Sequence, residues 1–238
     1  RATLVNEPDE ARACQLAAEA AAQGRAQVVM KGNAQTTTFT RALLDRTWGL
    51  VPQGNLISHV SLFVLPNYHK PILLADAAIN IEPDLERKKA ILRNTVDIAH
   101  RLGIARPKVA CLSPGEKINE KVPSTVHGAA LAAWQRTERA FGEAVVEGPL
   151  AFDVAFSSEA ARLKGISGEV VGDADILLCP CLDSANAIYK SLAIFGRAEH
   201  AGIIAGLKIP VALTSRSDHA ETRLASLRFA LAVSTPSA

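Results

Sequence analysis

Residues 214–218 read Thr-Ser-Arg-Ser-Asp and bring hydroxyl, guanidinium and carboxylate groups into one short segment. The apolar run 209–213 before it predicts a buried strand, and the spacing of Leu224, Leu227 and Leu231 after it predicts a helix. A helix N-terminus and a guanidinium both attract anions, and open α/β sheets bind ligands at the carboxyl ends of their strands. The segment therefore predicts an anion site. The alternative, on local features alone, is a plain helix cap, because Ser and Asp are favoured N-cap residues.

Two more polar segments follow predicted strands. The loop 31–38 lies between an apolar run at 26–30 and a helical pattern that carries Arg41. The turn-prone segment 76–84 follows the apolar run 71–75 and precedes a long helical pattern. Loops that follow strands in such units often carry ligand-binding groups, so both segments are candidates for a site.

Composition excludes several classes of protein. The chain has 238 residues, is 48% hydrophobic and carries a net charge of +2, without a dense Lys/Arg tract, which argues against nucleic-acid binding. It contains no apolar run long enough to span a membrane, so no membrane partner is expected. The four cysteines and six histidines do not stand at metal-ligand spacing, so no metal site is predicted. A reduced, cytoplasmic setting fits this cysteine content.

Strands and helices are expected to alternate along the chain, which predicts an α/β fold with a largely parallel sheet, or two such sheets. The expected strands are 26–30, 57–65, 71–75, 108–112, 144–146, 174–178 and 209–213. The expected helices are 8–24, one around 41–44, 85–102, 123–141, one that ends near 165, 183–197 and one after 218.

Six blocks follow one another along the chain: 74–80 (LADAAIN), 147–153 (EGPLAFD), 164–166 (KGI), 172–178 (GDADILL), 185–192 (ANAIYKSL) and 213–216 (LTSR). In this order they resemble the phosphate acetyltransferase/phosphate butyryltransferase (phosphotransacylase) family. The blocks 188–192 and 213–218 look closer to its butyryl or mixed acetyl/butyryl branch. The resemblance extends from about residue 30 to the end of the chain.

The resemblance implies an enzyme that interconverts a short-chain acyl-CoA plus phosphate with an acyl phosphate plus CoA. It implies two α/β domains with largely parallel sheets, similar to isocitrate and isopropylmalate dehydrogenases, with the active site in the interdomain cleft. Domain one is then expected to be 1–50 plus 208–238, without its first β–α unit, and domain two 51–207. A homodimer is expected, CoA is a substrate, and no tightly bound cofactor is implied.

The resemblance also assigns roles to residues. Arg216 holds the phosphate, Ser215 donates a hydrogen bond to the carbonyl oxygen as charge builds on it, and Arg41 is a second phosphate ligand. No covalent Ser215 ester is implied, since no His/Asp pair is recognisably arranged to activate it. The other residues expected at the substrates are Lys31, Asn33, Thr36, Asp76 and Asn80.

The reaction also needs a base that removes the CoA thiol proton, because free thiols are mostly protonated at neutral pH. The acetyltransferase branch places an Asp seven residues after the serine, where this chain has Thr222. Asp218 is the expected base, and Glu221 is the alternative. The alternative function is a non-catalytic acyl-CoA or acyl-phosphate binding relative. A dehydrogenase or decarboxylase would need an aspartate cluster for a metal, which the sequence lacks.

Overall fold

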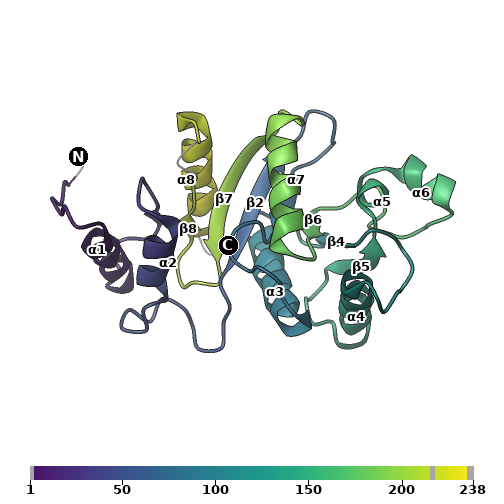
Figure 1. Cartoon of the computed structure of the whole chain (residues 1–238), viewed down its shortest axis with the longest axis horizontal. Coiled ribbons are helices and arrows are strands. Elements are labelled where there is room, and N and C mark those ends of the chain that lie inside the picture. Colours follow the sequence, from purple (N-terminus) through teal and green to yellow (C-terminus); the bar gives the residue numbers. More distant parts are fainter. Residues whose placement is uncertain (1–2, 215–217, 235–238) are drawn as a thin grey trace.

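Eight strands form one continuous sheet in the computed structural model of this chain, which describes residues 3–214 and 218–234. Their order across the sheet is β1-β8-β7-β2-β3-β6-β4-β5. The strand bounds are β1 Val29–Met30, β2 Ser58–Val64, β3 Ile72–Ala75, β4 Lys108–Leu112, β5 Val145–Leu150, β6 Ile176–Leu178, β7 Glu199–Ala205 and β8 Val211–Ala212. Figure 1 shows the sheet running along the molecule, with α1 and α2 at one end and α4 to α6 at the other.

Helices cover the sheet within the described residues. Their bounds are α1 Glu10–Ala22, α2 Thr36–Leu44, α3 Leu85–Arg101, α4 Pro123–Glu138, α5 Phe152–Phe156, α6 Ser158–Lys164, α7 Leu182–Ile194 and α8 Ala220–Ser234. Asp84 begins α3, because its side chain accepts a hydrogen bond from the backbone N–H of Arg87 at 2.8 Å. No helix in the described part of the chain is long and apolar enough to cross a membrane.

Parallel and antiparallel pairings occupy different parts of the sheet. The pairs β3–β6, β6–β4, β4–β5 and β1–β8 are parallel. The pairs β2–β3, β2–β7 and β7–β8 are antiparallel and join the two parallel parts. The predicted α/β class with a largely parallel sheet is therefore confirmed, and the strands of both expected domains lie in a single sheet. β7 was not among the expected strands.

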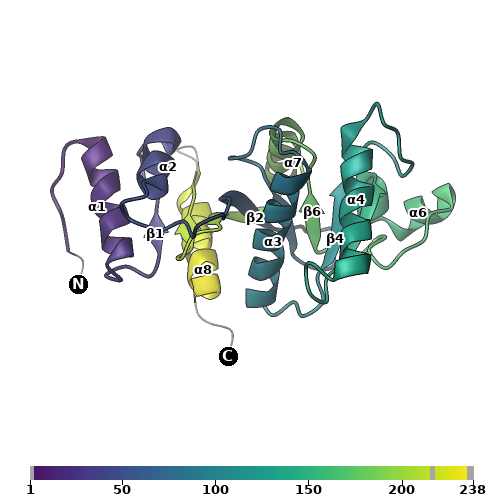
Figure 2. The same ribbon diagram turned by 90° about the horizontal axis from the view of Figure 1, so that it is seen from below.

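Alternate residues of each strand supply two separate cores, because successive side chains point to opposite faces of a sheet. Val60, Ile203 and Leu92 belong to one buried cluster, which α3, α4 and α8 cover. Phe63 and Leu74 belong to a second cluster on the opposite face, beneath α7 (Figure 2). A third cluster holds α1 and α2 against β1 and β8. α2 and α7 thus lie over neighbouring parts of the sheet, α2 over β1 and β8 and α7 over β2 and β3.

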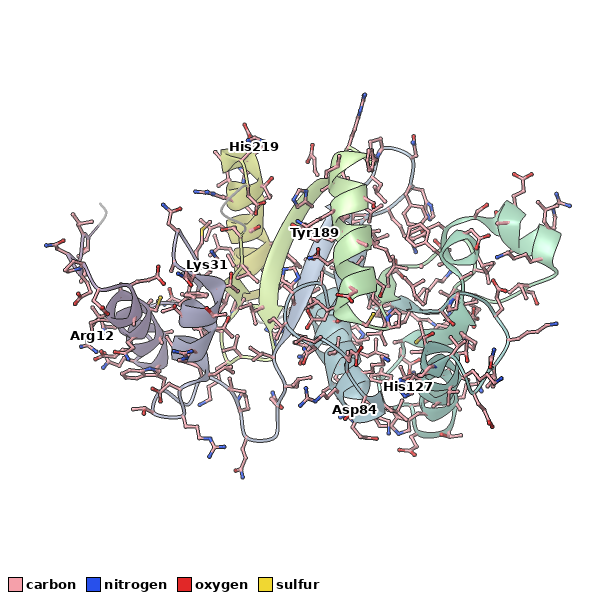
Figure 3. All side chains as sticks on the ribbon, viewed as in Figure 1. Arg12, Lys31, Asp84, His127, Tyr189 and His219 are labelled. Atoms are coloured by element: carbon pink, nitrogen blue, oxygen red, sulfur yellow. The ribbon has the colours of Figure 1, made fainter. Side chains whose placement is uncertain are left out.

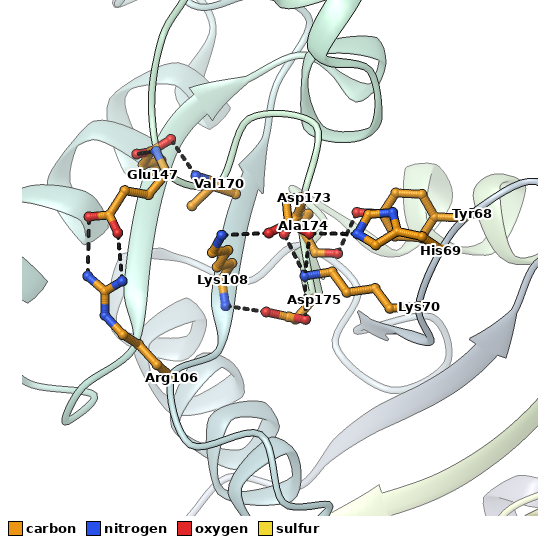
Figure 4. Close-up of polar contacts among 11 residues, drawn as sticks. Tyr68, His69, Lys70, Arg106, Lys108, Glu147, Val170, Asp173, Ala174 and Asp175 are labelled. Atoms are coloured by element: carbon orange, nitrogen blue, oxygen red, sulfur yellow. Dashed lines mark hydrogen bonds and ion pairs between the residues drawn. The ribbon is translucent and has the colours of Figure 1, made fainter.

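An ion-pair network joins the amino ends of β3, β4 and β6 (Figure 4). Lys108 Nζ lies 2.5 Å and Lys70 Nζ 2.8 Å from the carboxylate of Asp173, and His69 Nε2 lies 2.7 Å from it. Lys70 Nζ also lies 2.7 Å from Asp175 Oδ1. Burial acts to raise the pKa of Asp173, but the hydrogen bonds from Lys108, Lys70 and His69 hold that pKa well below its ordinary value. The network fastens three strands at the edge of the sheet opposite their carboxyl ends.

Candidate active site

Two adjoining cavities lie where β1, β3 and β8 end. The first, of about 640 Å³, is lined by Thr36, Thr37, Thr40, Arg41, Leu44, Asp45, Ala78 and Ile79. The second, of about 450 Å³, is lined by Thr36, Thr37, His59, Ala77, Ala78, Leu182, Asn186, Tyr189, Lys190, Leu213 and Thr214. Because Thr36, Thr37 and Ala78 line both cavities, the two form one cleft with α2 and α7 as walls. This is the sheet edge at which α/β proteins bind ligands.

α2 presents its polar face to the cleft. Thr36, Thr37, Thr40 and Arg41 follow one another at helical spacing, and Arg41 is exposed. Thr36 and Arg41, two of the residues expected at the substrates, thus both line the first cavity. Hydroxyls beside a guanidinium form a suitable surface for a phosphate group.

Lys31 lies beneath this wall and does not line it. Its side chain is buried, and Nζ donates to the carbonyl oxygens of Gly32 at 3.0 Å and Ala34 at 3.1 Å. Thr214 Oγ1 donates to the carbonyl oxygen of Lys31 at 3.0 Å, so the loop after β1 is joined to the end of β8. Lys31 thus shapes the loop that leads into α2, and neither it nor Asn33 belongs to the described lining of the cleft.

Asp76 and Asn80 shape the loop after β3 in a similar way. Asp76 Oδ1 accepts from the backbone N–H groups of Ala78 at 2.9 Å and Ile79 at 3.0 Å. Asp76 Oδ2 accepts from Asn80 Nδ2 at 2.6 Å, and Asn80 Nδ2 also donates to the carbonyl oxygen of Ile57 at 2.9 Å. Both side chains are buried, so their visible effect is to hold Ala78 at the cleft surface.

α7, on which no site residue was predicted, forms the other wall. Asn186, Tyr189 and Lys190 are three and four residues apart and line the second cavity. Asn186 Nδ2 donates to the carbonyl oxygen of Ala77 at 3.2 Å, which joins α7 to the loop after β3. Neither Lys190 nor Arg41 takes part in an ion pair with any described residue. Figure 3 shows Tyr189 on α7 and Lys31 on the side of α2.

His59, the second residue of β2, lines the second cavity and was not among the predicted site residues. Burial lowers the pKa of His59, although the charges of Asp76 and Asp218 act to raise it. Burial also raises the pKa of Tyr189, and Asp218 adds to that effect. Asp218 therefore lies close enough to interact with two side chains of the cleft. Glu221, the alternative base, is exposed in the first turn of α8.

The remaining predicted residues, Ser215 and Arg216, lie outside the described residues. Thr214, which directly precedes them in the chain, lines the second cavity. Within the described ranges, no group of three or more His, Cys, Asp or Glu residues is arranged to hold a metal ion.

A family model described as "Phosphate acetyl/butaryl transferase" matches residues 4–230 of the chain. The chain belongs to this family, a family of transferases, as predicted. A probable phosphate butyryltransferase from Bacillus subtilis is 42% identical over 229 residues, covering 96% of this chain and 75% of the relative.

Solved structures agree with this assignment. A branched-chain phosphotransacylase from Enterococcus faecalis is 41% identical, with a TM-score of 0.90, over 97% of this chain and 82% of that one. A putative 4-hydroxythreonine-4-phosphate dehydrogenase from Salmonella typhimurium is 13% identical, with a TM-score of 0.56, over 94% of this chain and 69% of that one. At that identity the likeness concerns the fold alone, which matches the expected dehydrogenase-like architecture.

Proposed function

We propose that the chain transfers a short-chain acyl group between CoA and phosphate in the cleft between α2 and α7. The observation that carries the proposal is the cleft itself, in a chain of this family. Its walls combine threonine hydroxyls with two cations, Arg41 and Lys190, that have no ion-pair partner among the described residues. Unpaired cations beside hydroxyls suit the phosphate groups that acyl phosphates and CoA share.

Three residues at the end of β8 carry the chemistry in this proposal. Arg216 neutralises the phosphate, and Ser215 donates a hydrogen bond to the carbonyl oxygen while it becomes an oxyanion. Asp218 takes part in removing the thiol proton, because only the thiolate is a strong nucleophile. Support comes from Thr214 in the cavity lining and from the electrostatic interaction of Asp218 with His59 and Tyr189.

The loops around the cleft have a supporting role in this proposal. Arg41 and Thr36 contact substrate directly, whereas Lys31, Asn33, Asp76 and Asn80 act through the loops that they belong to. The hydrogen bonds of Lys31, Asp76 and Asn80 to their own loops support that division.

The domain division expected from the family is also part of the proposal. Domain one combines 1–50 with 208–238, and domain two is 51–207, so that α2 and α7 belong to different domains. The pairing of β1 with β8 and the shared core of α1, α2 and β8 support this division.

We further propose a cytoplasmic homodimer that needs no tightly bound cofactor. All four cysteines are free, which suits a reducing compartment. Ile194 and Phe195, at the end of α7, are 66% and 84% exposed, and adjacent exposed apolar side chains are a common feature of subunit contacts.

A panel of acyl phosphates tests the proposed function. Acetyl, butyryl and isobutyryl phosphate are each mixed with CoA and the protein, and thioester formation is followed by absorbance. We expect turnover with at least one of them. CoA binding in calorimetry, without turnover of any acyl phosphate, would instead identify a non-catalytic binding relative.

A further inference from the structure

His59 is a polar residue in the interior of an apolar strand. It lies on β2, is 5% exposed, and shares a face of the sheet with Ser61 and Phe63, beneath α7. Its ring lines the second cavity together with Tyr189 and Thr214. A buried imidazole at such a place needs hydrogen-bond partners, because an unpaired buried polar atom is costly.

The described residues provide a partner for only one of its two ring nitrogens. Nδ1 lies 3.3 Å from Ser61 Oγ. Nε2 has no hydrogen-bond partner among residues 3–214 and 218–234. Gly202 packs closely beside Nε2, since a Cβ atom at that position would lie 2.8 Å from Nε2. Within the described residues, Nε2 is therefore available to a substrate group, in a residue that lines the cavity.

Charged and titratable groups surround this imidazole on several elements. Asp76 follows β3, and Asp218 precedes α8; both charges favour the protonated form of His59. α7 contributes Tyr189, whose ring centroid lies 6.3 Å from that of His59, and Lys190, which lines the same cavity. Burial outweighs the two carboxylates, so the pKa of His59 lies below its ordinary value and the ring is neutral at neutral pH.

A neutral imidazole fits the proton balance of the proposed reaction. When an acyl phosphate dianion and a CoA thiol become a thioester and hydrogen phosphate, one proton moves from sulfur to oxygen. A group that takes this proton and returns it completes the reaction with no other acid or base. A neutral imidazole can take this proton at one nitrogen and return it from the same nitrogen, as general acid–base catalysis requires.

We infer that His59 carries this proton, with Asp218 stabilising the imidazolium; the inference rests on the proposed acyl transfer. Nδ1–H donates to Ser61 Oγ, and Nε2 takes the proton from the CoA thiol. The thiolate attacks the carbonyl carbon, a C–S bond forms, and the C–O bond to phosphate breaks. The imidazolium then gives its proton to the departing phosphate oxygen, and His59 is neutral again. Asp218 would thus act through His59, by its negative charge, while Ser61 holds Nδ1.

The pH dependence of a His59→Gln variant tests the inference. We expect kcat/KM with acyl phosphate and CoA at pH 7 to fall by about 100-fold or more, within the usual contribution of general acid–base catalysis. The deficit should shrink as the pH approaches about 8.5, where a thiol ionises without help. CoA affinity, measured by calorimetry, should stay within about two-fold, because the variant removes a proton carrier and not a charge.

His200→Gln is the matched control. His200 lies on β7 over the same face of the sheet, and its ring centroid is 5.3 Å from that of Tyr189 and 5.7 Å from that of Phe63. It does not belong to the described lining of the cleft. The same substitution there should leave both kcat/KM and its pH profile unchanged.

Ser61→Ala is the second variant, for the case in which His59→Gln does not fold. Loss of the Ser61 hydroxyl removes a hydrogen bond to the imidazolium, so the acid limb of the kcat/KM profile should move to lower pH. A purely structural role would leave that limb in place.

Two results would overturn the inference while leaving the acyl transfer intact. One is a His59→Gln enzyme within three-fold of the wild type at pH 7 with the same pH profile. The other is a His59→Gln enzyme whose kcat/KM is lower than that of the wild type by the same factor at every pH. Absence of transfer by the wild-type protein with every acyl phosphate would instead refute the proposed function.

Discussion

Arg41 on α2 and Lys190 on α7 line one cleft from two different helices. Lys190 is exposed, and within the described chain neither residue has an acidic neighbour at ion-pair distance. Either side chain can therefore form a charged hydrogen bond to a phosphate without breaking an ion pair to a described residue. Such bonds contribute about 1.5–3 kcal/mol, equivalent to roughly 10- to 100-fold in affinity.

Lys190→Gln is expected to raise one KM by about 10-fold with a smaller change in kcat, because it removes binding energy and no reacting group. Initial rates with varied acyl phosphate, CoA and dephospho-CoA show which phosphate is bound. If the variant raises the KM for CoA but not the KM for dephospho-CoA, Lys190 binds the 3′-phosphate of CoA. Lys121→Gln, the same change at an exposed lysine outside the described cleft lining, is the control. Equal KM values in both variants would remove Lys190 from the site.

Arg216→Ala is expected to lower kcat/KM by about 100-fold or more and to raise the apparent KM for phosphate, because the developing negative charge loses its counter-charge. Steady-state kinetics in the direction from acyl-CoA plus phosphate measure both effects. Arg228→Ala, which removes an arginine from α8, is the control. A rate unchanged by Arg216→Ala would contradict the assigned role.

For single residues, the sequence indicated which loops carry polar groups. It indicated less well where each polar side chain lies. Thr36 and Arg41 line the cleft, whereas Lys31 turns back to its own loop carbonyls. Local sequence cannot tell which of these side chains lines the cleft and which turns away, because all three residues follow the same strand. His59 did carry a signal: with Ser61 it forms a polar pair two residues apart in an apolar strand, which places both on one buried face.

At the scale of elements, the network around Asp173 fastens β3, β4 and β6. Asp173→Asn is expected to lower the urea midpoint of unfolding at pH 7, because Lys70 and Lys108 lose their shared anion. The folded-state pKa of Asp173 is depressed, so its stabilisation is present above the unfolded pKa of about 3.9 and is lost as the pH falls further.

The difference between wild type and Asp173→Asn should therefore be largest near pH 7 and should narrow below about pH 4. Urea titrations at pH 7, 4 and 3 measure it. Asp97→Asn, which removes only an exposed ion pair with Arg101 on α3, is the control and should change little. A difference that grows as the pH falls would contradict the assigned role of the network.

Elements with strong local patterns were predicted closely. β4 has the expected bounds, and α3 begins at the expected residue because Asp84 caps it. β7 was missed because Glu199, His200 and Gly202 interrupt its apolar pattern. β7 is defined as a strand by its pairing with β2 and β8. β2 is distant in sequence, and β8 comes later in the chain. Long-range pairing of this kind leaves little trace in a local window.

At the scale of the whole molecule, the cleft joins an early segment of the chain to a late one. CoA that binds between α2 and α7 should slow amide hydrogen exchange in both helices, because it contacts both walls. Exchange measured by mass spectrometry with and without saturating CoA tests this. α6, which is remote from the cleft, is the internal control. Protection of only one wall would show that CoA does not bridge the cleft.

The pairing of β1 with β8 also bears on how the protein is made. During synthesis β1 leaves the ribosome long before its partner strand exists, so the short strand cannot complete its hydrogen bonds until nearly all of the described chain has been translated. β2 to β6, by contrast, can assemble while translation continues, although β2 still lacks β7 on its other edge. The nascent chain therefore carries an unfinished α1–β1–α2 segment, with its apolar surface uncovered, for most of its synthesis. That interval is when a chaperone would have the greatest effect on the yield of folded enzyme.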